Sequence, residues 1–417
     1  MVKKTIVVLG VQFLNIIVIF LSRFLFAKYL GSELYGVYNL MTLIPSLCVL
    51  LANLGLGHAI SYYVSKEQMD VSKIIFSATV YSLLVGGIIA MISNELFLAI
   101  YPSLEFKYLI KIVGTIPFLL FVYFTSYIFL GKQKTFDYFF INMSQAFFTL
   151  MIFAASYNFA QANVMETAAV SWLAGSLLSL LYTLIRLFQN KCISFSLPTI
   201  KELNHLCRFG IKMYMTSVIN FMNYRLDFFI IGFFLSSKHL GIYALAVAIA
   251  DSVGKISQSL SLIVFSKIPA LSKEKSNDLT TFALKINIVL TTGAIAFLTF
   301  AGEPIVDYLF NGEYNDSMTV FYYLAPGIIT ISIFRIIYHD LAGRDMAHFG
   351  VQATLVSFMA TLLLDFLLIP FFELKGAAIA SSLAYTVSCF YILKSYLKLT
   401  SVKYKELFWI KRRETAN

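Results

Sequence analysis

Long apolar runs follow one another along almost the whole chain. A helix needs about 20 mostly apolar residues to cross the hydrocarbon core of a bilayer, and it satisfies its own backbone hydrogen bonds there. Only 13% of the residues are charged, whereas about a quarter are charged in a typical soluble domain. The pattern predicts an all-α integral membrane protein with twelve transmembrane helices. The predicted spans are residues 5–27, 36–62, 74–98, 108–130, 138–159, 166–187, 210–234, 241–266, 282–301, 318–340, 350–371 and 376–397.

Lysine and arginine are distributed unevenly among the connections between these spans. With a cytoplasmic N-terminus, the inward-facing segments carry 23 of the 32 basic residues and the outward-facing segments carry five. Cytoplasmic loops of membrane proteins hold such an excess, so we predict that both termini are cytoplasmic. The same bias explains the net charge of +10 without a nucleic-acid partner, because no basic patch interleaved with aromatic residues is present.

Short motifs recur near the beginning and the end of each half of the chain. LGSELYGVY begins at Leu30 and LSSKHLGIY at Leu235, while TAAVSWLAG begins at Thr167 and AAIASSLAY at Ala377. Chance repetition in membrane helices is the alternative explanation. Six spans in each half would make the halves parallel repeats, which typically enclose a substrate site near the bilayer midplane. We therefore expect two pseudo-symmetric six-helix bundles around a central cavity.

The predicted domains follow from this repeat. The N-terminal bundle covers residues 1–190, a cytoplasmic linker covers 191–208, and the C-terminal bundle covers 209–397. The linker is the longest connection and contains Pro198 among charged and polar residues. The basic cytoplasmic tail at 398–417 can bind anionic lipid at about 1 kcal/mol per positive charge, although the ordinary excess of cytoplasmic positive charge explains it equally well.

The sequence contains no motif of an enzyme active site. It has no phosphate-binding GxxxxGK[ST] and no HExxH, and its five histidines lie far apart. The four cysteines lack the paired spacing of a metal site. We therefore expect no catalytic residue, no metal and no cofactor, which leaves a transporter or a scaffold.

Seven of the charged residues inside the predicted spans stand out as candidates, because a charge at the bilayer centre costs about 2.5 to 3.5 kcal/mol. Residues that bear such a cost are candidates for function. The cations that we expect to line a cavity and bind substrate are Arg23, Arg225, Lys255 and Arg335. The carboxylates that are candidates for ion coupling are Asp227, Asp251 and Asp365.

Most of these charges also have a structural interpretation. Arg225 lies 15 positions into its span, too deep to reach the headgroups easily, but it can be half of a buried ion pair. Arg23 can extend toward the headgroups, and Arg335 is near the cytoplasmic end of its span. Asp251 and Lys255 are four residues apart and can pair on one helix face.

Asp365 stands in LLLDFLLIP, with apolar neighbours on every side. Burial without a partner disfavours the charged form of a carboxylate. Asp365 is therefore a candidate proton site, and a hydrogen bond to a neighbouring span is the alternative.

Four segments of the chain resemble a known family of membrane proteins. They are FLFAKYLGSELYGVYNL from Phe24, NLGLGHAISYYVSK from Asn53, FGIKMYMTSVINFMNYRLDFFIIGFFLSSKHLGIYALAVAIA from Phe209 and LIPFFELKGAAIASSLAY from Leu368. They are similar to segments of the polysaccharide-exporter family, which includes the Wzx-type O-antigen and capsule flippases. The likeness extends over nearly the whole chain, but its motifs are structural turns and do not identify a sugar.

The resemblance implies a member of the multidrug, oligosaccharidyl-lipid and polysaccharide exporter superfamily, with the same two bundles and central cavity. Its cargo would be an oligosaccharide on undecaprenyl diphosphate, moved to the outer leaflet of the bacterial inner membrane. Arg23 and Arg225 match basic positions that similar proteins use to line the cavity. Asp365 departs from the family pattern, in which a neutral amide is commoner.

The resemblance also implies partners and leaves alternatives. The partners are membrane lipid, the lipid-linked glycan and a polysaccharide polymerase with glycosyltransferases. A drug antiporter of the same superfamily and a scaffold of a polysaccharide assembly complex remain alternative functions. Several tyrosines can either stack on sugar rings or belong to the interfacial aromatic belt. These are Tyr62, Tyr63, Tyr214, Tyr224, Tyr338 and Tyr385.

Overall fold

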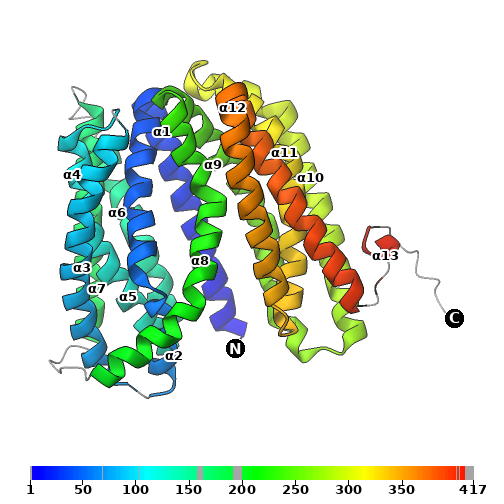
Figure 1. Cartoon of the computed structure of the whole chain (residues 1–417), viewed down its shortest axis with the longest axis horizontal. Coiled ribbons are helices and arrows are strands. Elements are labelled where there is room, and N and C mark those ends of the chain that lie inside the picture. The colour runs from blue at the N-terminus through cyan, green and yellow to red at the C-terminus, as the bar shows by residue number, and fades with distance from the viewer. Residues whose placement is uncertain are drawn as a thin grey trace. The chain divides into compact units, whose positions relative to one another are not determined.

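The computed structural model is built of helices and describes residues 2–67, 69–101, 103–156, 163–190, 200–400, 402 and 404–408. The helices are labelled in chain order in Figure 1. The first half contains α1 (Val2–Asn53), α2 (Leu56–Ser65), α3 (Val71–Ile100), α4 (Phe106–Val113), α5 (Ile116–Gly131), α6 (Thr135–Ser156) and α7 (Val164–Gln189). The second half contains α8 (Ile200–Phe234), α9 (Ser237–Lys267), η2 (Ile268–Ala270), α10 (Lys273–Phe310), α11 (Asn315–Gly343), α12 (His348–Thr400) and α13 (Tyr404–Phe408).

Nine helical segments among the described residues are long and apolar enough to cross a membrane. They fall in α1, α3, the α4 and α5 pair, α6, α7 and α9 to α12. The predicted all-α membrane architecture is therefore confirmed. The seventh predicted span lies within α8, which is not among the nine, so the count of twelve spans stays a prediction.

Two of the longest helices bend sharply at one residue. The first two predicted spans lie on either side of Gly31, where α1 has φ 72° and ψ 170°. The last two lie on either side of Glu373, where α12 has φ 51° and ψ −130°. Glycine adopts a positive φ at little steric cost, whereas a residue with a side chain does so under strain. Gly31 belongs to the LGSELYGVY motif, which therefore marks a bend in the chain.

The chain divides into two compact units, Met1–Phe221 and Met222–Asn417. The boundary between them along the chain falls within α8. Residues 191–199 of the predicted linker lie outside the described residues, and its remaining residues belong to α8. Of the predicted tail, residues 398–400, 402 and 404–408 are described. The predicted domain limits stay a prediction.

Unit 1 is held together by apolar packing and by polar contacts between adjacent helices. In its core, α3 packs against α5 and α6 against α7. The hydroxyls of Ser144 and Ser179 lie 2.6 Å apart between α6 and α7. Arg186 Nε donates to Asp137 Oδ1 over 3.0 Å where α7 ends and α6 begins. Small hydroxyl residues such as Ser144 and Ser179 let membrane helices approach closely and hydrogen bond.

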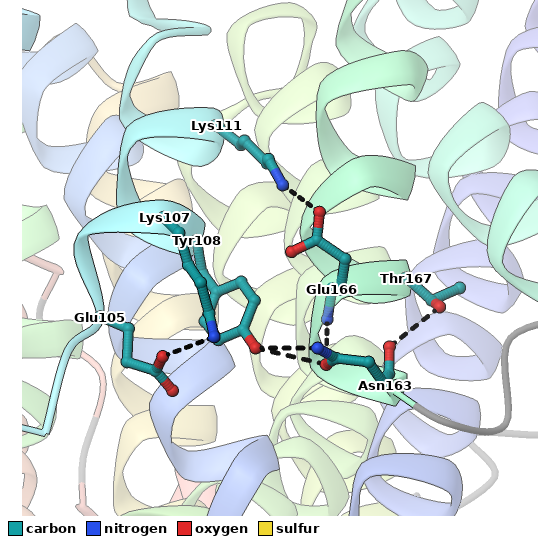
Figure 2. A network of polar contacts seen from close by, with 7 residues as sticks. All are labelled: Glu105, Lys107, Tyr108, Lys111, Asn163, Glu166 and Thr167. Atoms are coloured by element: carbon teal, nitrogen blue, oxygen red, sulfur yellow. Dashed lines mark hydrogen bonds and ion pairs between the residues drawn. The ribbon is translucent and has the colours of Figure 1, made fainter.

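A second set of polar contacts joins α4 to the opposite end of α7, as Figure 2 shows. The Tyr108 hydroxyl lies 3.3 Å from Asn163 Oδ1, and Lys111 forms an ion pair with Glu166. Asn163 also caps α7, because its Oδ1 accepts a hydrogen bond from the backbone N–H of Glu166 at 3.1 Å. These contacts fix the start of α7, so we assign them a structural role.

Unit 2 has its own apolar core and a buried ion pair that joins three helices. Asp340 is fully buried at the end of α11 and accepts hydrogen bonds from Arg344 Nε at 2.8 Å and from Thr280 of α10 at 2.7 Å. Arg344 also donates to Asn277 of α10 over 2.8 Å, and Asn277 donates to the backbone carbonyl of Thr400 in α12 over 3.1 Å. The ends of α10, α11 and α12 are thereby tied together.

Candidate functional site

A cavity in unit 2 brings together charged side chains from different predicted spans. Residues of α8, α9, α11 and α12 line it. On α9 and on α11 the lining residues recur at spacings of three, four or seven residues. Such spacing places side chains on one face of a helix. Most of the lining of α11 is apolar. The charged and aromatic lining residues are Arg225, Asp227, Asp251, Arg335, Tyr224, Tyr243 and Tyr385.

The cavity is small in this conformation. Its volume is about 50 Å³, whereas a ligand site typically measures about 300 to 1,000 Å³. The cavity has room for a few waters and is far smaller than a typical ligand site. A larger substrate therefore requires the surrounding helices to move apart.

Arg225 of α8 pairs with Asp251 of α9. The distance from Arg225 Nη2 to Asp251 Oδ2 is 3.1 Å, and the two side chains are 21% and 35% exposed. The guanidinium also lies over the ring of Phe228, with Cζ 5.5 Å from the ring centre. Arg225 thus lines a cavity and forms an ion pair, and its role as a substrate contact stays a prediction.

Asp227 is held by neutral donors. Its Oδ2 accepts a hydrogen bond from the Tyr243 hydroxyl, and its Oδ1 accepts one from the backbone N–H of Phe228 at 2.9 Å. Asp227 and Tyr243 are both buried. Hydrogen bonds to a carboxylate stabilise its charged form, so these two donors offset part of the cost of burial.

Arg335 of α11 is positioned by neutral groups as well. Its Nη1 donates to the backbone carbonyl of Gly254 in α9 over 2.8 Å and lies 3.4 Å from the hydroxyl of Ser257. Its Cζ is 5.8 Å from the ring centre of Tyr224, and that ring lies 6.0 Å from the ring of Tyr385. Two arginines and two tyrosines predicted from the sequence thus meet at one cavity.

Three other predicted site residues lie away from the cavity lining. Arg23 is a half-buried residue of α1 in unit 1. Lys255 lies one turn beyond Asp251, and its Nζ donates to Gln258 Oε1 over 3.1 Å. Asp365 of α12 is fully buried, and neither of its carboxylate oxygens has a hydrogen-bond partner among the described residues.

The remaining predicted tyrosines have contacts outside the cavity. Tyr62 packs edge-on against Tyr63, Tyr214 donates to the backbone carbonyl of Leu51 over 3.0 Å, and Tyr338 stacks on Phe334. Sequence reasoning missed Tyr243 and Gly254. Tyr243 lies eight residues before Asp251 on α9, a spacing that puts both on one face, so its role was detectable. Nothing in the sequence marked Gly254.

Comparison with known proteins places this chain in a family. A profile of the family described as "Polysaccharide biosynthesis protein" matches residues 25–319, which is more than half of the chain. The chain belongs to this family. The matched part of this polysaccharide biosynthesis protein contains Arg225, Asp227 and Asp251, while Arg335 and Asp365 follow it.

One curated relative of this polysaccharide biosynthesis protein is itself named as a glycan biosynthesis protein. It is the "Probable low-salt glycan biosynthesis flippase Agl15" of Haloferax volcanii, which is 23% identical over 251 residues. The match covers 58% of this chain and 52% of the relative. The chain therefore spans about half the length of the curated relative that it matches.

Solved structures show which fold this polysaccharide biosynthesis protein has. The lipid II flippase MurJ in an inward closed conformation superposes with a TM-score of 0.79 at 19% identity, covering 94% of this chain and 87% of MurJ. An inward-facing multidrug resistance MATE family transporter of the MOP superfamily superposes with a TM-score of 0.74 at 13% identity, covering 91% of this chain and 93% of the transporter. At these identities the likeness shows the fold alone, which is that of an α-helical membrane transporter.

Proposed function

We propose that this protein flips a lipid-linked glycan across a membrane by alternating access. Its membership of a polysaccharide biosynthesis family supports this proposal, and so do the names of Agl15, a "Probable low-salt glycan biosynthesis flippase", and of MurJ, a lipid II flippase. The observation that carries the proposal is the presence of Arg225 and Arg335 in one cavity of unit 2. Arg225 is paired with Asp251, but Arg335 is held by neutral groups, and an intramembrane cation held in this way favours an anionic substrate.

The diphosphate of a lipid-linked sugar is the group that these arginines would bind. A cation about 4 Å from a phosphate charge contributes roughly 4 kcal/mol at an effective dielectric of 20. A guanidinium can also donate two parallel hydrogen bonds to phosphate oxygens. Two arginines therefore offset much of the cost of removing the diphosphate from water. Tyr224 and Tyr385, beside the arginines, are placed to contact an adjoining sugar ring.

We further propose which lipid carries the glycan and which membrane contains the protein. The cargo is an oligosaccharide repeat unit on undecaprenyl diphosphate, and the membrane is the bacterial inner membrane, with both termini of the protein in the cytoplasm. Arg23 and Lys255 are proposed as further substrate contacts in more open conformations. The product then supplies O-antigen, capsule or exopolysaccharide synthesis, with a polymerase and glycosyltransferases as partners.

We also propose that carboxylates of unit 2 couple flipping to an ion gradient. Asp227 and Asp251 line the cavity, and Asp365 is buried without a hydrogen-bond partner among the described residues. If Asp365 binds the coupling ion, Asp365→Asn abolishes the response of flipping to an imposed proton or sodium gradient in vesicles. An unchanged response would remove Asp365 from this role.

A drug antiporter is the second candidate function. The same carboxylates are suited to a cationic drug, and the fold is shared with a multidrug transporter. A drug-susceptibility screen on cells with and without the protein distinguishes the two functions. The flippase proposal predicts no change in susceptibility to cationic drugs.

The decisive cellular experiment identifies the intermediate that accumulates without this protein. Cells that lack it should accumulate lipid-linked repeat units on the cytoplasmic face, detected by mass spectrometry of the lipid extract, and the wild-type gene should clear them. A non-transporting scaffold predicts that a variant with both cavity arginines replaced by alanine still supports polymer synthesis. Normal polymer without an accumulated intermediate in that variant would contradict the flippase proposal.

A further inference from the structure

The side chain of Arg335 contacts α9 at Gly254 and Ser257. We call this contact site, formed by the Gly254 carbonyl and the Ser257 hydroxyl, the seat of Arg335. Nη1 of Arg335 donates to the backbone carbonyl of Gly254 over 2.8 Å, and Ser257, one turn further along α9, presents its hydroxyl at 3.4 Å. The Ser257 hydroxyl donates to the same Gly254 carbonyl over 2.8 Å, so Arg335 and Ser257 share this acceptor, and the lone pairs of the hydroxyl remain to face Arg335.

Gly254 makes this seat accessible because it has no side chain. A Cβ built on Gly254 would lie 2.9 Å from Arg335 Nη1, and its other two close contacts would be Cζ at 3.8 Å and Nη2 at 3.9 Å. All three nearest atoms thus belong to the guanidinium, which is the far end of a flexible side chain. An added methyl group would therefore displace Arg335 and leave the backbone of α9 and α11 in place.

The two arginines of the cavity differ in how their charge is compensated. Arg225 has Asp251 at 3.1 Å. Arg335 has no carboxylate within 4.0 Å among the described residues, and its contacts are a carbonyl, a hydroxyl and the ring of Tyr224. A substrate anion must displace Asp251 from Arg225, whereas Arg335 is held in position with its charge available. Arg335 is therefore better prepared to bind an anion first.

We infer that Gly254 is a positioning residue that holds Arg335 as the first anion-binding cation of the cavity. The identity of the anion, a phosphate of the lipid-linked glycan, rests on the proposed function. The seat itself rests only on the geometry of Gly254, Ser257 and Arg335.

The test compares two glycine substitutions and uses inorganic pyrophosphate as the probe. Gly254→Ala removes the seat, and Gly293→Ala in α10 is the matched control because nothing lies within 4 Å of the added Cβ. Calorimetry on the purified full-length protein measures the dissociation constant. Gly254→Ala should weaken pyrophosphate binding about tenfold, while Gly293→Ala leaves it unchanged. Equal affinity in Gly254→Ala and wild type would overturn the inference.

A double variant separates positioning from general packing. In the Arg335→Ala background, Gly254→Ala should cause no further loss of affinity, because the guanidinium that it displaces is already absent. The same loss in both backgrounds would show that Gly254 acts through helix packing, which contradicts the inference. The inference would also be contradicted if Gly254→Ala raised the pyrophosphate affinity of Arg335→Ala to that of the wild-type protein.

Vesicle assays distinguish failure of this inference from failure of the proposed function. If wild-type protein flips lipid-linked glycan but Gly254→Ala has the same half-saturating substrate concentration, the seat has no role and the flippase function stands. If wild-type protein flips no glycan but pyrophosphate binding depends on Gly254 and Arg335 as described, the seat stands and the proposed function fails.

Discussion

The charged residues of the cavity in unit 2 differ in the partners that hold them. Asp251 neutralises Arg225 over 3.1 Å, Tyr243 and a backbone N–H hold Asp227, and neutral groups hold Arg335. If Arg225 binds a substrate phosphate as we propose, the carboxylate of Asp251 competes with that phosphate for the guanidinium.

Replacing Asp251 by asparagine tests this competition. The amide keeps the size of the side chain but loses the charge, so an anion binds Arg225 without first breaking an ion pair. Because the pair is partly exposed, we expect pyrophosphate affinity to rise by no more than about fivefold, which corresponds to about 1 kcal/mol. Calorimetry on the purified protein measures it, with Asp278→Asn on the exposed start of α10 as the control. Weaker binding in Asp251→Asn would contradict the competition.

Individual helices are joined by polar contacts whose burial decides their importance. The pair of Asp340 and Arg344 joins α11 to α10 and, through Asn277, to α12. Its two side chains are 0% and 13% exposed. The pair of Glu105 and Lys107 at the start of α4 is more than half exposed. A buried pair that loses one partner leaves an uncompensated charge, whereas water replaces the partner of an exposed one.

Arg344→Ala should therefore destabilise unit 2. Removing the guanidinium leaves Asp340 with the Thr280 hydroxyl as its side-chain donor, and we expect a loss of roughly 3 kcal/mol in stability. The thermal unfolding midpoint in detergent should fall by several degrees. Lys107→Ala is the control and should leave the midpoint almost unchanged. Equal midpoints for Arg344→Ala and Lys107→Ala would argue against a structural role for the buried pair.

The sequence was informative about elements and less so about the site. The apolar runs predict the helices because burial in lipid demands them. The position of Arg225 deep in a span drew attention to a residue that lines a cavity and pairs with Asp251, while its role toward a substrate stays a prediction. Helix rotation and packing determine that Arg335 reaches across to the backbone of Gly254, and no local pattern encodes that contact. The bends at Gly31 and Glu373, in contrast, fall in the breaks that the sequence predicts between spans, at residues 28–35 and 372–375.

At the scale of the whole molecule, each of the two units has its own core, and α8 runs from one into the other. The charged cavity lies within unit 2, while Arg23, the cation predicted for the first half, belongs to unit 1. The cavity of about 50 Å³ is far smaller than a typical ligand site of about 300 to 1,000 Å³. The transport cycle that we propose for a lipid-linked glycan therefore includes a state in which this cavity is wider.

Flipping by the purified protein in vesicles tests the central claim most directly, namely that Arg225 and Arg335 bind the diphosphate of a lipid-linked glycan. The measurement is the fraction of undecaprenyl-diphosphate oligosaccharide that becomes accessible to a glycosidase on the opposite face. Wild-type protein and Lys238→Ala, which removes an exposed cation, should flip at equal rates. The variant with Arg225→Ala and Arg335→Ala should insert normally and flip at the rate of protein-free vesicles. Flipping by that variant at the wild-type rate would contradict the account.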